Sequence, residues 1–267
     1  MAGIVTLAGS PPRSAGQDAI ITFQGWLGGL VARRRSDTPI VHYPVERRAS
    51  VKDVIEALGV PHTEVGRLTA NDQEVDFSYL LAPGDEVMVE PLAPPVDVTT
   101  ATLLRPEPLP ALRFLIDHNV AKLAARLRMA GFDTLFHPEW HDEELALESR
   151  RQQCILLTRD VQLLKRKGVE YGHLVREERP TRQLAEILHF YGLNKAVRPF
   201  GRCLRCNAPL HEVAKEEIID HLEPLTKKYY HSFRRCPACG RIYWAGSHHA
   251  KMVRLLAELV HYQPLPY

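Results

Sequence analysis

Long hydrophobic segments are missing from this 267-residue sequence. No uninterrupted apolar run approaches the roughly 20 residues that a transmembrane helix needs. The first twenty residues, MAGIVTLAGSPPRSAGQDAI, also lack the charged start and continuous apolar core of a secretory signal peptide. We therefore expect no membrane span and a cytoplasmic location. Hydrophobic residues still make up 45% of the chain, which is enough for one large domain or two smaller ones.

Cysteine is also scarce, with five in the chain, and four of these fall into two Cys-x-x-Cys pairs separated by 29 residues. This pattern is typical of a metal site in a reducing compartment, with Cys154 left over. Four thiolates in two such turns give the closed tetrahedral site of a structural Zn²⁺. A redox dithiol is the competing interpretation, but it needs a thioredoxin-like context that the sequence lacks. The predicted zinc ligands are Cys203, Cys206, Cys236 and Cys239.

Charge is unevenly distributed, although the whole chain carries a formal net charge of only +2. Residues 1–110 have 9 Lys and Arg against 14 Asp and Glu, a balance of −5, which leaves +7 on residues 111–267. The C-terminal part is therefore suited to a polyanionic partner. Alternatively, these charges form an ordinary solvated surface.

A segment rich in proline and threonine, LAPPVDVTTATLLRPEPLP at residues 92–110, has no apolar periodicity and indicates a linker. It separates parts of the chain whose sequence patterns differ. We predict a domain at 17–92, the linker at 93–110, a second domain at 111–200 and a C-terminal unit at 201–262.

The N-terminal unit combines strand-like segments with one helix. The stretch ASVKDVIEALGVP has a complete set of helix signals, with Ser50 as N-cap, Asp53 three residues later, and Gly59 and Pro61 as the stop. The order of two strands, a helix and short strands ending in PGDEVMVEP resembles the ubiquitin-like β-grasp fold, in the branch that contains small sulfur-carrier proteins. Those carriers end in a free Gly-Gly, whereas this chain continues through Pro91. We therefore expect a docking module for a protein partner rather than a carrier.

Strand and helix patterns alternate over residues 111–200. Strand-like segments such as ALRFLI and CILLT each precede a helical pattern. Such alternation predicts right-handed crossovers and a parallel sheet with helices on both faces. Functional residues collect at the carboxyl ends of the strands in sheets of this kind. Asp117 follows the first strand, and Asp160 follows the strand at CILLT.

Acidic residues also open the helix that leads into the third strand, with Asp142 and Glu143 at its start. Carboxylates that share one cleft repel each other unless a hard divalent cation such as Mg²⁺ or Mn²⁺ lies between them. Such a cation activates water and stabilises charge on a phosphodiester. The alternative is that Asp117, Asp142 and Asp160 only cap or favour the starts of the helices that follow them.

The segments FLIDHNVAKLAARLRMAGFDTLF and DEELALESRRQQCILLTRD resemble the PIN-type ribonuclease superfamily. Within it, residues 112–255 are similar to the PIN-like ribonuclease family named after the C-terminal region of the mut-seven exonuclease. Members carry a zinc ribbon after the nuclease core and sometimes a ubiquitin-like domain before it. The resemblance implies that Asp117, Asp142 and Asp160 are catalytic and hold Mg²⁺ or Mn²⁺. Further candidates for this site are Glu143, Thr158, Arg159 and Asp133.

A basic stretch with aromatic residues, KKYYHSFRR, lies between the two cysteine pairs. Its rings can stack on bases while its cations neutralise phosphates. Alternatively, the aromatic residues pack a small ribbon that has little core of its own. The residues predicted to bind RNA are Arg205, Lys227, Lys228, Tyr230, Arg234, Arg235 and Arg241.

The sequence thus predicts an α/β fold with a PIN-like parallel sheet, an N-terminal β-grasp domain and a C-terminal zinc ribbon. The expected function is a metal-dependent endoribonuclease that acts on RNA, with a catalytic Mg²⁺ or Mn²⁺ and a structural Zn²⁺. The alternative is a non-catalytic RNA-binding or ribosome-associated factor that keeps the PIN fold. An incomplete set of carboxylates favours this alternative, whereas a strict Mn²⁺ requirement for cleavage would exclude it.

Overall fold

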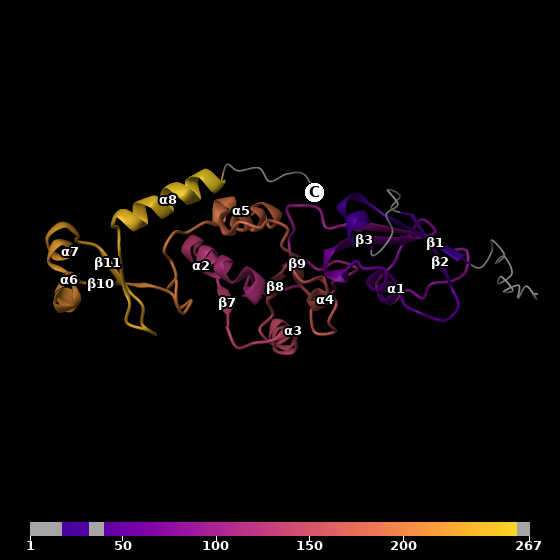
Figure 1. Cartoon of the computed structure of the whole chain (residues 1–267), viewed down its shortest axis with the longest axis horizontal. Coiled ribbons are helices and arrows are strands. Elements are labelled where there is room, and N and C mark those ends of the chain that lie inside the picture. The colour runs from indigo at the N-terminus through magenta and orange to yellow at the C-terminus, as the bar shows by residue number, and fades with distance from the viewer. Residues whose placement is uncertain (1–17, 32–39, 261–267) are drawn as a thin grey trace, which may run out of the picture.

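The computed structural model describes residues 18–31 and 40–260. These residues form an N-terminal domain, a central domain and a C-terminal unit that follow one another along the long axis of the molecule (Figure 1). None of the helices in these ranges is long and apolar enough to cross a membrane. The predicted α/β class, with a sheet domain before the parallel sheet and a cysteine cluster after it, is confirmed.

The N-terminal domain is a five-stranded mixed sheet with one α-helix packed on it. Its elements are β1 (Asp18–Phe23), β2 (Ile40–Pro44), α1 (Val51–Ala57), β3 (Val65–Ala70), β4 (Gln73–Glu74) and β5 (Glu86–Pro91). The strands occur in the order β2-β1-β5-β3-β4, and only the central pair of β1 and β5 is parallel. The helix α1 begins where the sequence predicts it, because Ser50 Oγ accepts a hydrogen bond from the Asp53 backbone N–H at 3.1 Å.

The central domain is a four-stranded parallel sheet covered by helices on both faces. Its elements are β6 (Phe114–Ile116), α2 (Ala121–Ala130), β7 (Thr134–Phe136), α3 (Asp142–Arg151), β8 (Ile155–Thr158), α4 (Val161–Leu164), β9 (Gly172–Leu174) and α5 (Pro180–Phe190). The strand order is β7-β6-β8-β9, and β6, β8 and β9 are buried at every residue. Side chains alternate along each strand. Phe114 and Ile116 therefore share a core with α2 and α5, whereas Leu115 shares one with α3 and α4.

The C-terminal unit is a three-stranded antiparallel sheet followed by a long helix. Its elements are β10 (His211–Val213), α6 (Lys215–Ile218), α7 (Pro224–Tyr229), β11 (Phe233–Arg235), β12 (Ile242–Trp244) and α8 (Ser247–Val260). Its own core is small and consists of Ile218, Leu222 and Phe233. Helix α8 extends back over the central domain, where Leu256 and Leu259 join the core that includes α5 (Figure 1). The ribbon is thus anchored by α8.

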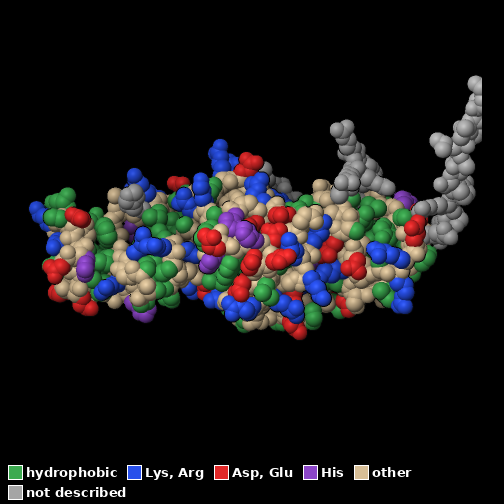
Figure 2. Space-filling view, turned by 60° about the horizontal axis from the view of Figure 1, so that its bottom comes forward, with side chains coloured by type: hydrophobic (Ala, Val, Ile, Leu, Met, Phe, Trp, Pro, Cys, Tyr) green, Lys and Arg blue, Asp and Glu red, His purple; other side chains and the backbone are tan. Residues whose placement is uncertain are grey.

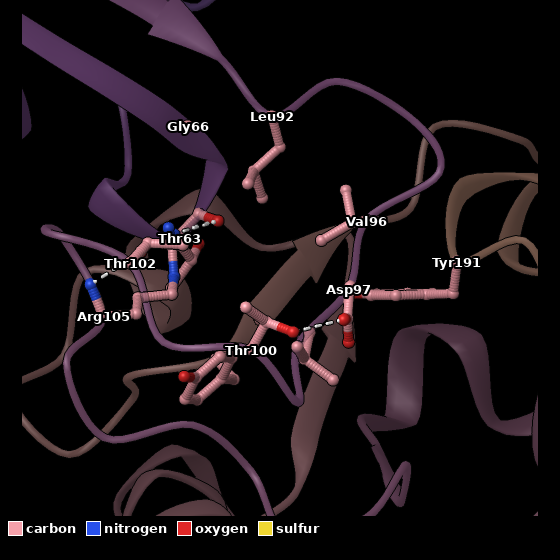
Figure 3. Close-up of a pocket in the computed structure, with 12 residues that line it drawn as sticks. Thr63, Gly66, Leu92, Val96, Asp97, Thr100, Thr102, Arg105 and Tyr191 are labelled. Atoms are coloured by element: carbon pink, nitrogen blue, oxygen red, sulfur yellow. Dashed lines mark hydrogen bonds between the residues drawn. The ribbon is translucent and has the colours of Figure 1, made fainter.

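The linker is folded against both of its neighbours. Leu104 is buried in the core of the N-terminal domain, and Val98 is buried in the core of the central domain. The guanidinium group of Arg105 donates hydrogen bonds of 2.9–3.1 Å to three backbone carbonyl oxygens of the N-terminal domain. Figure 3 shows this junction, where the linker passes between Thr63 of the N-terminal domain and Tyr191 of the central domain. The linker is therefore part of the interface between the domains.

The N-terminal domain docks on β9, one of the two outer strands of the central sheet. Glu64 is fully buried and accepts hydrogen bonds from the backbone N–H of Leu174 at 2.7 Å and from the guanidinium group of Arg176 at 2.8 Å. The same guanidinium group lies 3.7 Å from the centre of the Trp26 ring. The buried carboxylate of Glu64 in the N-terminal domain thus accepts hydrogen bonds from a backbone N–H and from an arginine of the central domain.

Replacing Glu64 with alanine is expected to lower the free energy of unfolding by about 3–5 kcal/mol, because Arg176 and the Leu174 N–H lose their buried acceptor. Urea unfolding followed by circular dichroism measures the difference. Glu74→Ala is the matched control, because Glu74 is half exposed and lies 3.8 Å from Arg67. Its effect is expected within about 0.5 kcal/mol of zero. Equal effects of the two substitutions would contradict the proposed importance of Glu64.

Candidate active site and metal centre

Asp117 and Asp160 follow two neighbouring strands of the central sheet. Asp117 comes directly after β6, and its backbone N–H donates to the carbonyl oxygen of Leu157 in β8 at 3.1 Å. Asp160 comes two residues after the end of β8 at Thr158. Because parallel strands bring their carboxyl ends to the same edge of a sheet, both acids lie at one edge.

Thr158 connects these two acids through its hydroxyl group. Its Oγ1 donates a hydrogen bond to Asp117 Oδ2 at 2.6 Å and accepts one from the backbone N–H of Asp160 at 2.9 Å. The Thr158 side chain is fully buried at the last position of β8. A β-branched side chain has few rotamers available to it, so the burial fixes the direction of the hydroxyl group. The two carboxylate-bearing loops are therefore held in a fixed relation.

Asn119 completes this network, although sequence reasoning does not single it out. Its Nδ2 donates to Asp117 Oδ2 at 2.6 Å and to Thr158 Oγ1 at 3.1 Å. Its Oδ1 accepts a hydrogen bond from the backbone N–H of Arg159 at 3.0 Å. The signal that identifies it is its place two residues after Asp117, where a short polar side chain can reach back to the strand end.

Both carboxylates keep acceptor positions free after their hydrogen bonds are counted. Asp117 Oδ1 accepts one bond, from the His118 N–H at 2.5 Å, and Oδ2 accepts two. Asp160 Oδ1 accepts one from the Gln162 N–H at 2.7 Å, which makes Asp160 the N-cap of α4. A carboxylate offers about four acceptor positions. Within the described residues, capping thus leaves oxygen positions that suit a hard cation such as Mg²⁺.

His118 adds an imidazole ring beside Asp117, and the sequence pattern did not predict a role for it. Its Nε2 bonds to the carbonyl oxygen of Pro138, which can only accept, so Nε2 carries the proton in the neutral ring. Nδ1 then has a lone pair and lies 3.9 Å from Asp117 Oδ1. Figure 2 shows histidine and acidic side chains close together on the middle part of the molecule.

The acids at the start of α3 are held by an arginine instead of joining the bonds around Thr158. Asp142 Oδ2 lies 3.3 Å from the Arg166 guanidinium group, and Glu143 Oε1 lies 3.9 Å from it. The side chains of Asp142 and Glu143 are 45% and 88% exposed. In the described part of the chain, no group of three or more carboxylates lies close enough together to form a ready-made site for an ion.

Asp133 lies at the opposite end of the sheet, directly before β7. It accepts a hydrogen bond from Asn207 Nδ2 at 2.6 Å and pairs with Arg113 at 3.3 Å and Arg202 at 3.2 Å. Asn207 and Arg202 flank the first Cys-x-x-Cys turn. Asp133 therefore ties the ribbon to the central domain, away from the edge that holds Asp117.

The four cysteines of the two Cys-x-x-Cys pairs come together in one cluster. Their sulfur atoms all lie within 4.8 Å of one another. Among the residues described, this is the one group of at least three His, Cys, Asp or Glu side chains that could hold an ion. Four sulfur ligands in two turns suit a closed tetrahedral site for an ion such as Zn²⁺. The cluster members are Cys203, Cys206, Cys236 and Cys239.

Tyr243 supports the cluster from β12. Its hydroxyl oxygen lies 3.1 Å from Cys203 Sγ and accepts the backbone N–H of Leu204 at 3.2 Å. Burial alone raises the pKa of Cys203. The hydrogen bonds from Tyr243 and from the backbone N–H groups of Cys206 and Arg205 outweigh burial and lower this pKa to about 6. The lowered pKa favours the thiolate of Cys203, which is the form of a cysteine that binds metal.

The strand order, the two acids at the carboxyl edge and the four-cysteine cluster define an α/β domain followed by a ribbon whose cysteines could hold a metal ion. Residues 112–256 match the family model described as the Mut7-C RNAse domain, and residues 17–97 match the model described as Mut7-C ubiquitin. The first match spans more than half of the sequence, so the chain belongs to the Mut7-C RNAse domain family. The resemblance inferred from the sequence is confirmed, with the two domains in the expected order. Neither the curated proteins nor the solved structures gave a match.

The purified protein is expected to contain one zinc ion per chain, and Cys203→Ser is expected to lose it, because a serine supplies no thiolate. A colorimetric zinc chelator added to the denatured protein measures the content. Cys154→Ser is the matched control, because Cys154 is buried in the central domain outside the cluster. Its zinc content is expected to equal that of the wild type. Wild-type protein without zinc would refute the assignment.

Proposed function

We propose that this chain is a metal-dependent endoribonuclease that hydrolyses phosphodiester bonds of RNA. One observation carries the proposal: in a domain of an RNAse family, Asp117 and Asp160 stand at one sheet edge and Thr158 bonds to both residues. The alternative, in which the two acids only cap helices, does not explain this shared hydroxyl group. Each acid already accepts a hydrogen bond from a backbone N–H of the helix that follows it.

Mg²⁺ or Mn²⁺ is the proposed catalytic ion, and the free oxygen positions of Asp117 and Asp160 would hold it. When bound, such an ion makes water more acidic and stabilises charge on the phosphodiester. The chain's own contribution is to fix the carboxylates. Asn119 and Thr158 both donate to Asp117 Oδ2, which leaves Oδ1 as the oxygen with an open position. Hydrogen bonds of this kind orient a ligand and raise metal affinity.

Asp142 is the third acid of the proposed site, with Glu143 beside it as the alternative. Both are paired with Arg166 in the structure. Exposed ion pairs of this kind contribute only about 0–1 kcal/mol. Arg166 therefore competes only weakly with a divalent cation for these two carboxylates. Once displaced from them, its charge is proposed to neutralise a phosphate of the substrate.

RNA is the proposed substrate, and cations near the acidic edge and on the ribbon are proposed to contact its phosphates. Arg159 lies beside Asp160, and its guanidinium group donates to the carbonyl oxygen of Glu177 at 3.0 Å while its side chain is 36% exposed. On the ribbon, the exposed candidates are Arg205, Lys228, Arg235 and Arg241, and the partly buried ones are Lys227, Tyr230 and Arg234.

Cleavage of single-stranded RNA is expected to require Mg²⁺ or Mn²⁺ and to fall more than about 100-fold in Asp117→Asn, because an amide is a poorer ligand than a carboxylate. Gel analysis of a labelled RNA with each ion and with EDTA measures the rates. Asp220→Asn is the control, because Asp220 is exposed on the ribbon. If wild type and Asp117→Asn give the same products while both bind RNA, the protein is a binding factor.

Thr158→Val is expected to slow cleavage about 10- to 100-fold with little change in RNA affinity, because valine keeps the shape but removes the hydroxyl group between the acids. Single-turnover cleavage and fluorescence anisotropy measure the two quantities. Thr134→Val is the matched control. Thr134 is equally buried, but its hydroxyl group donates to the carbonyl oxygen of Phe132 at the other end of the sheet. Equal rates for the two variants would remove Thr158 from the site.

A further inference from the structure

One face of the N-terminal sheet is open to solvent, whereas α1 covers the other face. Side chains alternate along each strand, and Ile21 is buried in the core that includes α1. Its neighbour Thr22 therefore points to the open face, and the cross-strand partners of Thr22, Ile40 in β2 and Met88 in β5, point there too. Ile40 and Met88 are 43% and 38% exposed. The open face thus presents two large apolar residues to solvent.

A hollow of about 230 Å³ lies on the open face. This is the space of roughly eight water molecules, which is enough for one long side chain. Met88 is held in its wall, because its Sδ accepts a hydrogen bond from Gln24 Nε2 at 2.8 Å. The hollow combines apolar and hydroxyl-bearing side chains with two acids. These lining residues are Ile20, Thr22, Thr69, Met88, Asp72 and Glu86.

Asp72 and Glu86 bring two carboxylates to the hollow. Glu86 pairs with Ile20 across the strands and so shares its face, and Asp72 lies in the turn between β3 and β4. Among the contacts of the described residues, neither carboxylate forms an ion pair or accepts a hydrogen bond. Glu74 of the same sheet differs, because it lies 3.8 Å from the Arg67 guanidinium group. The charge of the two acids is therefore available to a cation from outside the chain.

A lysine or arginine side chain matches this combination of groups. Its apolar stem covers hydrophobic surface while its charged head stays in contact with water. An inorganic cation would leave the apolar side chains uncovered, and a purely apolar side chain would leave the acids without a partner. Exposed ion pairs add little affinity by themselves. The segment that binds must therefore also bring an apolar side chain, for which Ile40 offers a contact beside Thr22.

We propose that this hollow docks a basic segment of a partner protein. The stem of one lysine or arginine lies on Met88, and its charged head lies beside Asp72 and Glu86. An adjacent apolar side chain of the segment lies on Ile40. The balance of −5 over residues 1–110 favours the approach of such a segment. The N-terminal domain is at the end of the molecule opposite the ribbon (Figure 1), and the proposal does not depend on RNA being the substrate.

Selection from a phage library of random short peptides is the test, because no sequence has to be assumed for the partner. The full chain is the bait, and peptides that bind the variant Asp72→Asn/Glu86→Gln are removed first. Both replacements keep the size of the side chain, and asparagine is tolerated at the φ of +63° that Asp72 adopts. The remaining peptides are expected to carry a lysine or arginine next to an apolar residue.

A synthetic copy of the selected peptide is then titrated into the full chain, and amide chemical shifts in NMR spectra report the affinity and the site. The affinity is expected to fall about 2- to 30-fold in Asp72→Asn/Glu86→Gln, which is the range for loss of two exposed ion pairs. Added salt is expected to weaken binding to the wild type. Glu74→Gln/Asp76→Asn is the matched control, because it removes two exposed carboxylates of the same domain outside the hollow. Its affinity is expected to equal that of the wild type.

A second pair of variants tests the apolar contact. Met88→Ala is expected to weaken binding about 3- to 10-fold, because the stem of the basic side chain loses part of the surface that it covers. Leu80→Ala is the control, because Leu80 is 45% exposed in the same domain but outside the hollow. Urea unfolding of each variant reports whether the domain is intact. If Met88→Ala is unfolded, Ile40→Ala is judged by the same criterion.

Three results overturn the proposal. They are a selection that leaves no peptide, remaining peptides without a basic residue, and equal affinity of Asp72→Asn/Glu86→Gln and the wild type. Sedimentation of the chain alone tests a different occupant. A wild type that is a dimer and becomes a monomer in Asp72→Asn/Glu86→Gln shows that a second copy fills the hollow, which also overturns the proposal.

Discussion

The central parallel sheet is buried on both faces, and this constraint determines where its functional groups can stand. Because β6, β8 and β9 have no exposed residue, side chains that meet solvent or another domain occur only at the edges of the sheet. The carboxyl edge carries Asp117 and Asp160, the amino edge carries Asp133 next to the ribbon, and the outer strand receives Glu64 from the N-terminal domain. The carboxyl edge, the amino edge and the outer strand thus make different contacts, and the buried core of the sheet holds the three in fixed positions.

The ribbon is supported by the central domain as well as by its own cysteine cluster. Its apolar core is small, and α8 and the contacts of Asp133 supply the rest of its support. Tyr243 contributes to the cysteine cluster through its hydroxyl group, and its residue pairs with Arg234 between the strands β11 and β12. The geometry of the cysteine cluster and the pairing of the ribbon strands are therefore connected through one residue.

The sequence predicts well what local patterns encode. The cap at Ser50, the acids at two strand ends and the cysteine spacing are signals within a few residues, and the structure contains each of these features. Contacts between residues far apart in the sequence cannot be predicted from local patterns. Glu64 lies 112 positions before Arg176, and nothing in its own neighbourhood shows that it is buried. The ion pair between Asp142 and Arg166 also cannot be predicted from the sequence, because the partner of an exposed carboxylate is decided by the tertiary fold.

The docking of the N-terminal domain has a consequence for the backbone groups at the outer edge of the central sheet. An uncovered outer strand offers unpaired backbone N–H and C=O groups, which invite strands of other molecules to extend the sheet. Strand β9 lies at an outer edge of the central sheet, and its Leu174 N–H donates a hydrogen bond to Glu64 of the N-terminal domain. Without the N-terminal domain, the Leu174 N–H would lose this acceptor and would be open to pairing with another strand. The ubiquitin-like domain thus covers an outer edge of the parallel sheet within its own molecule.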